Sequence, residues 1–383
     1  MAKIVLVMIV KNEVAVIGRC LESVLPLIDE VFIVDTGSTD GTRELIAEIL
    51  VINKIPFHIF DKPWVDFATN RNEALELARR SSHCDYILTI DADEVLSYDS
   101  GFNATALKMA LSADIYNIHT QYGGIKYVRP QLFKLAIPFK YVGVVHEYLE
   151  IPEGIEVTTE TIGDLYNHPI QDGARSKDPE KYANDAAALV KALQTVEKGS
   201  FLESRYTFYL AQSWKDAGNT SQAIKEYLNR AKQGYWNQER YISYLTAGRL
   251  RESQDDGNSA FYLYASAHQV CPDRWEAVHG MVKVLRLQAL YQTAYHIADS
   301  WWEHQYGWGP QYEEAEDNLF VEDWVKTYGF LDELSMVAHY AGNYKYALHI
   351  YDLLLTMEAI IPVADYTRIE ANRKFTKTAI TEG

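Results

Sequence analysis

The sequence has few of the features that define disulfide-rich, zinc-binding and membrane-spanning proteins. Its three cysteines, Cys20, Cys84 and Cys271, are far apart and odd in number, so they provide neither a disulfide framework nor a zinc-ligand spacing. A reducing compartment, the cytoplasm, is the simplest interpretation. No apolar run approaches the roughly 20 residues that span a bilayer, and we therefore expect no membrane span.

Clusters of basic residues are missing as well. The chain carries 36 Lys and Arg against 53 Asp and Glu, which gives a formal net charge of -17 and a pI near 5.1. A field of that sign repels phosphate backbones, and no local run of Lys and Arg offsets it. Nucleic acid is therefore disfavoured as a partner.

The length indicates two domains. A chain of 383 residues exceeds the size at which a single hydrophobic core usually stops growing. After about residue 177, strand-like runs become rare, and helix formers and aromatic residues predominate. We place the two predicted domains at residues 1–175 and 176–383.

Strand-like and helical stretches alternate in the first third of the chain. The apolar start, residues 4–10, is too short for a signal peptide and is interpreted as a buried strand. The predicted strands are 4–10, 30–34, 58–59 and 86–90, and the predicted helices are 15–25, 42–51 and 68–80. Such alternation is typical of an α/β fold, in which helices flank a mainly parallel sheet.

Polar clusters follow three of these strands directly, at residues 11–13, 35–41 and 91–94. Open α/β sheets bind their ligands beyond the carboxyl ends of the strands. The sequence therefore predicts a ligand site at this edge of the sheet.

A helical repeat is visible in the second half of the chain. Similar patterns begin at four alanines, and the spacing between two of them is 34 residues, the period of tetratricopeptide repeats; the four are Ala223, Ala260, Ala294 and Ala347. We expect an all-α, TPR-like domain that binds the acceptor or forms a homodimer. The alternative is an irregular bundle in which these alanines are only packing positions.

An aromatic insertion at residues 301–320 breaks the repeat. Its Trp and Tyr side chains could stack on a sugar or grip a peptide. The alternative, which we prefer, is that they pack a long loop onto the helices.

Asp91 and Asp93 follow an apolar strand and are separated by one small residue. Two such carboxylates can reach a hard divalent cation that is shared with substrate phosphates. The alternative is a solvated surface turn, which the preceding buried strand disfavours.

Asp35 also follows a buried strand, and a turn rich in Gly, Ser and Thr comes after it. A carboxylate at that position can accept a hydrogen bond from the imide N–H of a nucleobase, and the hydroxyl of Thr36 can bind polar ligand atoms. Thr39 or Asp40 could instead cap the next helix. Capping explains Asp35 less easily.

Four motifs, in this order and at these distances, resemble the catalytic domain of family 2 glycosyltransferases, which have the GT-A fold. The motifs are "MIVKNE", "VDTGSTDGT", "DFATNRNEALELA" and "LTIDADE", and "RPQLFK" and "GVVHE" continue the resemblance. It covers roughly residues 3–170 and is most similar to members in which this domain precedes tetratricopeptide repeats.

The resemblance implies a role for each matching residue. Asp35 would face the base, with the rest of the nucleoside pocket formed by Lys11, Asn12, Glu13 and Thr36. Arg71 and Asn72 would lie close to the diphosphate or the metal site. Asp91 and Asp93 would hold Mn²⁺ or Mg²⁺ on that diphosphate, and His168 would add a ligand.

Glu147 is our candidate for the general base that deprotonates the acceptor. It matches the acidic position of "GVVHE", although the family more often has a Glu-Asp pair there. The alternative is a structural role for His146 and Glu147 as a hydrogen-bonded pair.

The resemblance implies a hexosyltransferase-type enzyme that moves a sugar from a nucleotide-sugar to an acceptor with inversion. A carboxylate opposite an imide suits uracil best, so a UDP-sugar is the expected donor. Neither the sugar nor the acceptor can be named from these motifs. A sugar nucleotidyltransferase would be expected to have a Gly-rich loop after the first strand, and 11–13 lacks glycine. A catalytically silent scaffold remains the other alternative.

Overall fold

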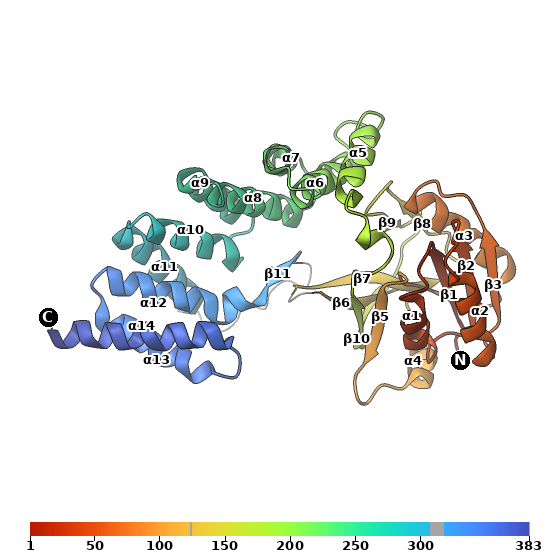
Figure 1. The fold of residues 1–383 in the computed structure, drawn as a ribbon, viewed down its shortest axis with the longest axis horizontal. Coiled ribbons are helices and arrows are strands. Elements are labelled where there is room, and N and C mark those ends of the chain that lie inside the picture. The colour runs from red at the N-terminus through yellow and green to blue at the C-terminus, as the bar shows by residue number, and fades with distance from the viewer. Residues whose placement is uncertain (123–124, 307–317, 383) are drawn as a thin grey trace. The chain divides into compact units, whose positions relative to one another are not determined.

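The computed structural model describes residues 1–122, 125–306 and 318–382. The chain divides into two compact units, Met1–Val196 and Glu197–Gly383 (Figure 1). The division falls after residue 196, whereas the sequence-based boundary lies after residue 175. Residues 176–196 are thus grouped with the first unit.

One half of the sheet in the first unit is parallel. Its strands lie in the order β3-β2-β1-β4, and all three pairings are parallel. The strands are β1 (Ile4–Val10), β2 (Glu30–Asp35), β3 (Phe57–Asp61) and β4 (Tyr86–Thr89), and the connecting helices are α1 (Ile17–Val24), α2 (Thr42–Ile52) and α3 (Phe67–Ser81). The predicted α/β fold is confirmed.

The other half of the sheet is mixed. It continues in the order β7-β6-β10-β5, in which β7 is antiparallel to β4 and β6, and β10 is parallel to β6. These strands are β5 (Glu94–Tyr98), β6 (Ile115–Tyr122), β7 (Ile125–Lys134) and β10 (Thr159–Pro169). The remaining elements are the hairpin β8 (Lys140–Val142) and β9 (Tyr148–Glu150), the helices α4 (Ala104–Ala110) and α5 (Lys181–Ala192), and the 3₁₀ turn η1 (Arg175–Lys177).

The sheet has a hydrophobic core on each face because successive strand residues point to opposite sides. Ile4 and Leu6 of β1 pack with α1 and α2, whereas Val5 and Val7 pack with α3. β1 is therefore buried on both faces, which is why it reads as an uninterrupted apolar run.

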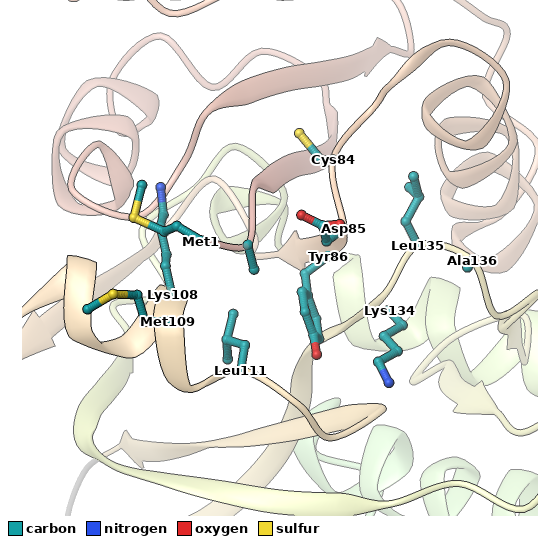
Figure 2. A pocket seen from close by; sticks show the side chains of 11 residues that line it. Met1, Cys84, Asp85, Tyr86, Lys108, Met109, Leu111, Lys134, Leu135 and Ala136 are labelled. Atoms are coloured by element: carbon teal, nitrogen blue, oxygen red, sulfur yellow. The ribbon is translucent and has the colours of Figure 1, made fainter.

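A pocket of about 590 Å³ opens at the opposite edge of the sheet from the predicted site. Tyr86 at the start of β4 lines it, together with Lys108 and Lys134 (Figure 2). Both lysines form ion pairs at 2.8 Å, Lys108 with Asp29 and Lys134 with Asp114. The pocket contains none of the predicted site residues.

The second unit is built from consecutive helix pairs, each helix in contact with the next (Figure 1). The pairs are α6 (Phe201–Asp216) with α7 (Thr220–Lys232), α8 (Asn237–Glu252) with α9 (Gly257–Val270), α10 (Trp275–Leu287) with α11 (Tyr291–Tyr306), and α12 (Phe330–Tyr340) with α13 (Tyr344–Leu354). A short extended segment (Val321–Glu322) and a π-helical turn (Val325–Gly329) precede α12, and a 3₁₀ turn (Leu355–Met357) and α14 (Val363–Glu382) follow α13. The predicted all-α repeat architecture is confirmed.

The alanines that suggested the repeat lie in the second helix of each pair. All four are fully buried, which follows from their place where neighbouring helices approach closely; they are Ala223, Ala260, Ala294 and Ala347. No helix of the described residues is long and apolar enough to cross a membrane.

The aromatic insertion is described only in part. Trp301 is 9% exposed and packs edge-on against Trp275, with ring centroids 5.9 Å apart, and Trp302 packs against the same ring. These two side chains belong to the helical core. Residues 307–317 lie outside the described residues.

Tyr264 of α9 is held between two glycines of neighbouring helices. A Cβ on Gly248 would lie 2.7 Å from the Tyr264 ring, and one on Gly280 would lie 2.9 Å from it. The ring is 1% exposed and cannot move away from either helix.

We expect Gly248→Ala to lower the free energy of unfolding of the helical unit by about 1–2 kcal/mol. Overpacking costs about 1–3 kcal/mol, and the better helix propensity of alanine recovers up to about 1 kcal/mol. Urea unfolding of the full chain measures the change. Gly234→Ala is the matched control, because a Cβ there meets no atom within 4 Å; equal stability of the two variants would contradict the packing argument.

Candidate functional site

The three polar clusters meet at one edge of the sheet. Val10 at the end of β1 pairs with Asp35 at the end of β2, and Val7 pairs with Thr89 at the end of β4. Because β1 lies between β2 and β4, the segments that follow these strands emerge side by side.

Asp35 is almost completely buried, with 1% of its surface exposed. Its Oδ1 accepts hydrogen bonds from the backbone N–H groups of Gly37 and Ser38, both at 2.7 Å. Within the described structure its Oδ2 is buried without a hydrogen-bond partner. A buried acceptor without a partner is costly, so Asp35 Oδ2 is the atom of this loop pair at which a donor from a ligand or a water molecule would be accommodated.

The loops that follow β1 and β2 are joined by side-chain hydrogen bonds. Asn12 donates its backbone N–H to Ser38 Oγ at 2.9 Å and accepts from the N–H of Thr39 at 2.8 Å. The N–H of Glu13 donates to Thr42 Oγ1 at 2.8 Å. Asn12 therefore shapes the loop pair with both its backbone and its side chain.

Thr36, Asp40 and Lys11 have different surroundings. The buried hydroxyl of Thr36 donates to the carbonyl of Val10 at 3.1 Å. The N-cap residue of α2 is Gly41, which has no side chain, so neither Thr39 nor Asp40 occupies the predicted cap position. Asp40 lies one residue earlier and accepts from the N–H of Thr42, the first residue of the helix, at 3.0 Å. The side chain of Lys11 is exposed.

Arg71 of α3 connects two carboxylates. Its Nη2 donates to Asp91 Oδ1 and its Nε donates to Glu147 Oε1, each at 2.5 Å. The side chains of Arg71 and Glu147 are 12% and 11% exposed, and that of Asp91 is 40% exposed. The structure thus brings together three predicted site residues from distant parts of the sequence.

Electrostatics reinforce this triad. Burial opposes ionisation of Asp91, but the charges of Arg71 and Arg129 outweigh it and lower the pKa of Asp91. Burial likewise opposes the charge of Arg71, but Asp91 and Glu147 raise its pKa well above the ordinary value. Both shifts favour the charged forms of Asp91 and Arg71 near neutral pH.

Asn72 fixes the backbone of Tyr141, and the ring of Tyr141 packs against Arg71. The amide of Asn72 donates to the backbone carbonyl of Tyr141 and accepts from its N–H, both at 2.8 Å. The guanidinium of Arg71 lies 5.5 Å from the centre of the Tyr141 ring. Asn72, which we predicted close to the diphosphate or the metal site, thus has its amide engaged by the backbone of Tyr141.

Asp93 and Glu13 form an acidic pair beside Gly173. Burial raises the pKa of Glu13 to about 7, and the charges of Asp93, Asp40 and Asp91 add to the rise while the N–H of Ala174 opposes it. Burial and then the charge of Asp91 raise the pKa of Asp93. Carboxylates that repel one another in this way favour a bound cation.

His168 lies on β10, where its Nε2 is 2.6 Å from Ser97 Oγ. Within the part of the chain that the structure describes, no three His, Cys, Asp or Glu side chains are grouped closely enough to hold a metal ion. Asp91 and Asp93 still fit a magnesium or manganese ion whose other ligands are phosphate oxygens and water, because such ions commonly use one or two carboxylates.

Glu94 and Arg129 are site residues that the motif analysis did not assign. Glu94 Oε2 accepts from Arg129 Nη2 at 2.8 Å and from the backbone N–H of Asp91 at 3.1 Å. Glu94 is 3% exposed, and it orients the turn that carries Asp91 and Asp93. The motifs "LTIDADE", which ends in Glu94, and "RPQLFK", which begins with Arg129, could have identified both residues from the sequence.

The N-terminal part of the chain matches a known protein family. Residues 5–106 match the family model "Glycosyl transferase family 2". The chain carries a family 2 glycosyltransferase domain. The matched segment of this glycosyltransferase domain includes Asp35, Arg71, Asp91 and Asp93, and the predicted resemblance is confirmed.

Two curated relatives match parts of the chain. A TPR repeat-containing protein of Synechococcus elongatus is 31% identical over 158 residues, which are 39% of this chain and 36% of the relative. An uncharacterized glycosyltransferase of Rickettsia felis is 37% identical over 97 residues, which are 25% of this chain and 31% of the relative. The chain thus spans about a third of the length of these relatives.

Among solved structures, S. aureus TarS 1–349 in complex with UDP-GlcNAc is 14% identical to this chain, with a TM-score of 0.34. The likeness covers 71% of this chain and 93% of that chain.

Proposed function

We propose that the protein is a metal-dependent glycosyltransferase that moves a sugar from a UDP-sugar to an acceptor with inversion. The observation that carries the proposal is the buried oxygen of Asp35 without a partner in the described structure, at the same edge of the sheet as the Arg71–Asp91–Glu147 triad. It supplies a hydrogen-bond acceptor for a nucleobase next to charged groups suited to a transfer reaction.

The nucleoside pocket is formed by the loops that follow β1 and β2. Uracil has an imide N–H, and Asp35 Oδ2 can accept a hydrogen bond from it. Asn12 and Thr36 hold the loops in place from inside, and Lys11 and Glu13 border the pocket.

Asp91 and Asp93 would hold Mn²⁺ or Mg²⁺ on the diphosphate, with His168 as a further candidate ligand. Such an ion neutralises charge on the leaving phosphate oxygens. The raised pKa of Asp93 and the excess of carboxylates around it support a cation at this position.

Glu147 and Arg71 have separate roles in the proposed transfer. Glu147 accepts the proton of the acceptor hydroxyl as that oxygen attacks the anomeric carbon. Arg71 holds Glu147 through Nε and Asp91 through Nη2, so it fixes the distance between the base and the leaving-group side of the site. Direct displacement of the nucleoside diphosphate by the acceptor inverts the anomeric centre.

We propose that the helical unit serves acceptor binding or homodimer formation. Stacked aromatic rings on its surface support this role: Tyr291 and Tyr340 have ring centroids 4.7 Å apart, and Tyr340 is 52% exposed. Exposed rings of this kind bind sugar faces or a partner protein.

A hydrolysis screen of nucleotide-sugars with Mn²⁺ tests the function. Donor-selective hydrolysis supports a transferase, and absence of binding to any donor would refute it. A crystal soak with UDP and Mn²⁺ shows which oxygens of Asp35, Asp91 and Asp93 the donor uses.

We expect Asp35→Asn to weaken UDP binding about ten- to a hundred-fold. The amide keeps one oxygen for Gly37 and Ser38 but places an NH₂ group where the imide donor arrives, which removes a charge-assisted hydrogen bond worth about 1.5–3 kcal/mol. Isothermal titration with UDP measures the change. Asp99→Asn, an exposed aspartate of the same unit, is the control, and an unchanged UDP affinity of Asp35→Asn would rule out the base contact.

A further inference from the structure

Residues 170–177, which we name the strap, run from the end of β10 across the acidic site. The N–H of Ile170 donates to the carbonyl of Asp93 at 3.0 Å, and the N–H of Ala174 donates to Glu13 Oε2 at 3.2 Å. Asp172 forms a two-fold ion pair with Arg19 of α1. The strap is therefore fixed to the segments that follow β1 and β4.

Gly173 brings the strap into direct contact with the carboxylates. A Cβ at this position would lie 3.0 Å from Glu13 Oε2 and 3.1 Å from Asp93 Oδ2. This approach is tighter than almost any side chain tolerates, so glycine lets the backbone reach both acids. Ala174 and Arg175 therefore directly follow a residue that contacts Glu13 and Asp93.

Arg175 comes two residues after this contact. Its guanidinium lies 4.6 Å from the centre of the Phe67 ring, and it forms an ion pair with Asp185 of α5. Phe67 and Arg71 are one turn apart on α3 and share a face of that helix. Arg175 therefore contacts α3 at a residue one helical turn before the arginine that connects Asp91 with Glu147.

The site needs positive charge if it is to hold a diphosphate. Five carboxylates surround it, and its two most enclosed arginines, Arg71 and Arg129, are each engaged by carboxylates; the five are Glu13, Asp91, Asp93, Glu94 and Glu147. Arg175 is 44% exposed, whereas its partner Asp185 is 7% exposed. The guanidinium thus has an open side from which phosphate oxygens can approach.

We propose that Arg175 binds the diphosphate of the donor, and that phosphate oxygens replace or share its contact with Asp185. The planar fork of arginine suits phosphate oxygens, and the ring of Phe67 holds it in place. This inference rests on the proposed function and names the residue that recognises the charged part of the donor.

Binding of UDP and of uridine separates this role from a structural one. We expect Arg175→Ala to weaken UDP binding about ten-fold or more and to leave uridine binding unchanged, because uridine lacks phosphates. Arg175→Lys should recover part of the UDP affinity, since it keeps the charge but loses the fork. Should Arg175→Ala fail to fold, Arg175→Gln, which retains a planar group beside Phe67, takes its place.

Two controls accompany these variants. Arg80→Ala removes a 75% exposed arginine of α3 and should leave UDP affinity at the wild-type value. Asp185→Asn should bind UDP at least as tightly as wild type, because the competing carboxylate is gone. Circular dichroism and thermal unfolding verify that each variant is folded.

Equal UDP affinity of wild type and folded Arg175→Ala would overturn the inference and leave the proposed function standing. Parallel loss of UDP and uridine binding would also overturn it, because the strap would then be supporting the pocket. Failure of the wild-type protein to bind UDP or uridine would overturn the UDP-donor proposal, and the inference with it.

Discussion

Asp93→Asn is expected to abolish Mn²⁺-dependent hydrolysis of the donor while leaving the fold intact. The amide has nearly the same size and retains an oxygen for the backbone N–H of Gly173, but it removes the negative charge that a divalent cation requires. Removal of repulsion between Asp93 and its acidic neighbours should also leave stability unchanged or slightly increased. Hydrolysis assays with and without Mn²⁺, together with thermal unfolding, measure both effects.

Asp216→Asn provides the control for this substitution. Asp216 forms an exposed pair with Lys215 in the helical unit, and its loss should change neither hydrolysis nor its metal dependence. Wild-type activity in folded Asp93→Asn would remove Asp93 from the proposed metal site.

Glu147→Gln is expected to lower sugar transfer by about 10² to 10⁴ while UDP binding stays near the wild-type value. Removal of a positioned base costs a factor of this size, and glutamine keeps the shape of the side chain and an oxygen for Arg71 Nε. Transfer kinetics with an identified acceptor measure the first quantity, and titration with UDP measures the second.

Glu150→Gln is the matched control, because Glu150 is exposed on the neighbouring strand β9. A fall in UDP affinity along with transfer would indicate that Glu147 acts only by holding Arg71. Transfer at the wild-type rate would place the base elsewhere. Asp164, exposed on β10, is then the next candidate, ahead of Asp172, which Arg19 holds on both oxygens.

Local pattern was sufficient to locate the parallel half of the sheet. The predicted strand 30–34 is β2 (Glu30–Asp35), and the predicted helix 68–80 is α3 (Phe67–Ser81). These elements have a clear hydrophobic periodicity, and the residues proposed to bind the donor follow the strands directly. Asp35 could be found in this way because its position depends on the strand that precedes it.

The mixed half of the sheet and the closure of the site depend on contacts between distant residues. The residues of β5 pair with residues of β10 that are about seventy positions later in the sequence. The N–H of Ala174 donates to Glu13, which is 161 positions earlier. The Arg71–Glu147 contact spans 76 positions. Loop closure of this kind leaves no periodic signal in the sequence, so the strap and Arg175 could not be identified from it.

The repeat region was predictable for a different reason. Helices that pack closely need small residues at their contacts, so the spacing of the alanines indicates a helical repeat. Ala260 and Ala294 are separated by the predicted period. Tyr264 between Gly248 and Gly280 was not predicted, because it depends on which helices become neighbours. The role of the insertion at 301–320 stays a prediction beyond Trp301 and Trp302.

The hydrogen bonds between the loops after β1 and β2 determine how much entropy ligand binding must remove. Asn12 joins Ser38 and Thr39, and Thr42 joins Glu13 to Asp40, so the two loops around Asp35 are held together without a ligand. Little of the interaction energy is then lost to arranging the pocket. If the proposed donor binds here, its affinity at this end of the site reports the fit of the base itself, and a change at Asn12 would act by loosening the free protein.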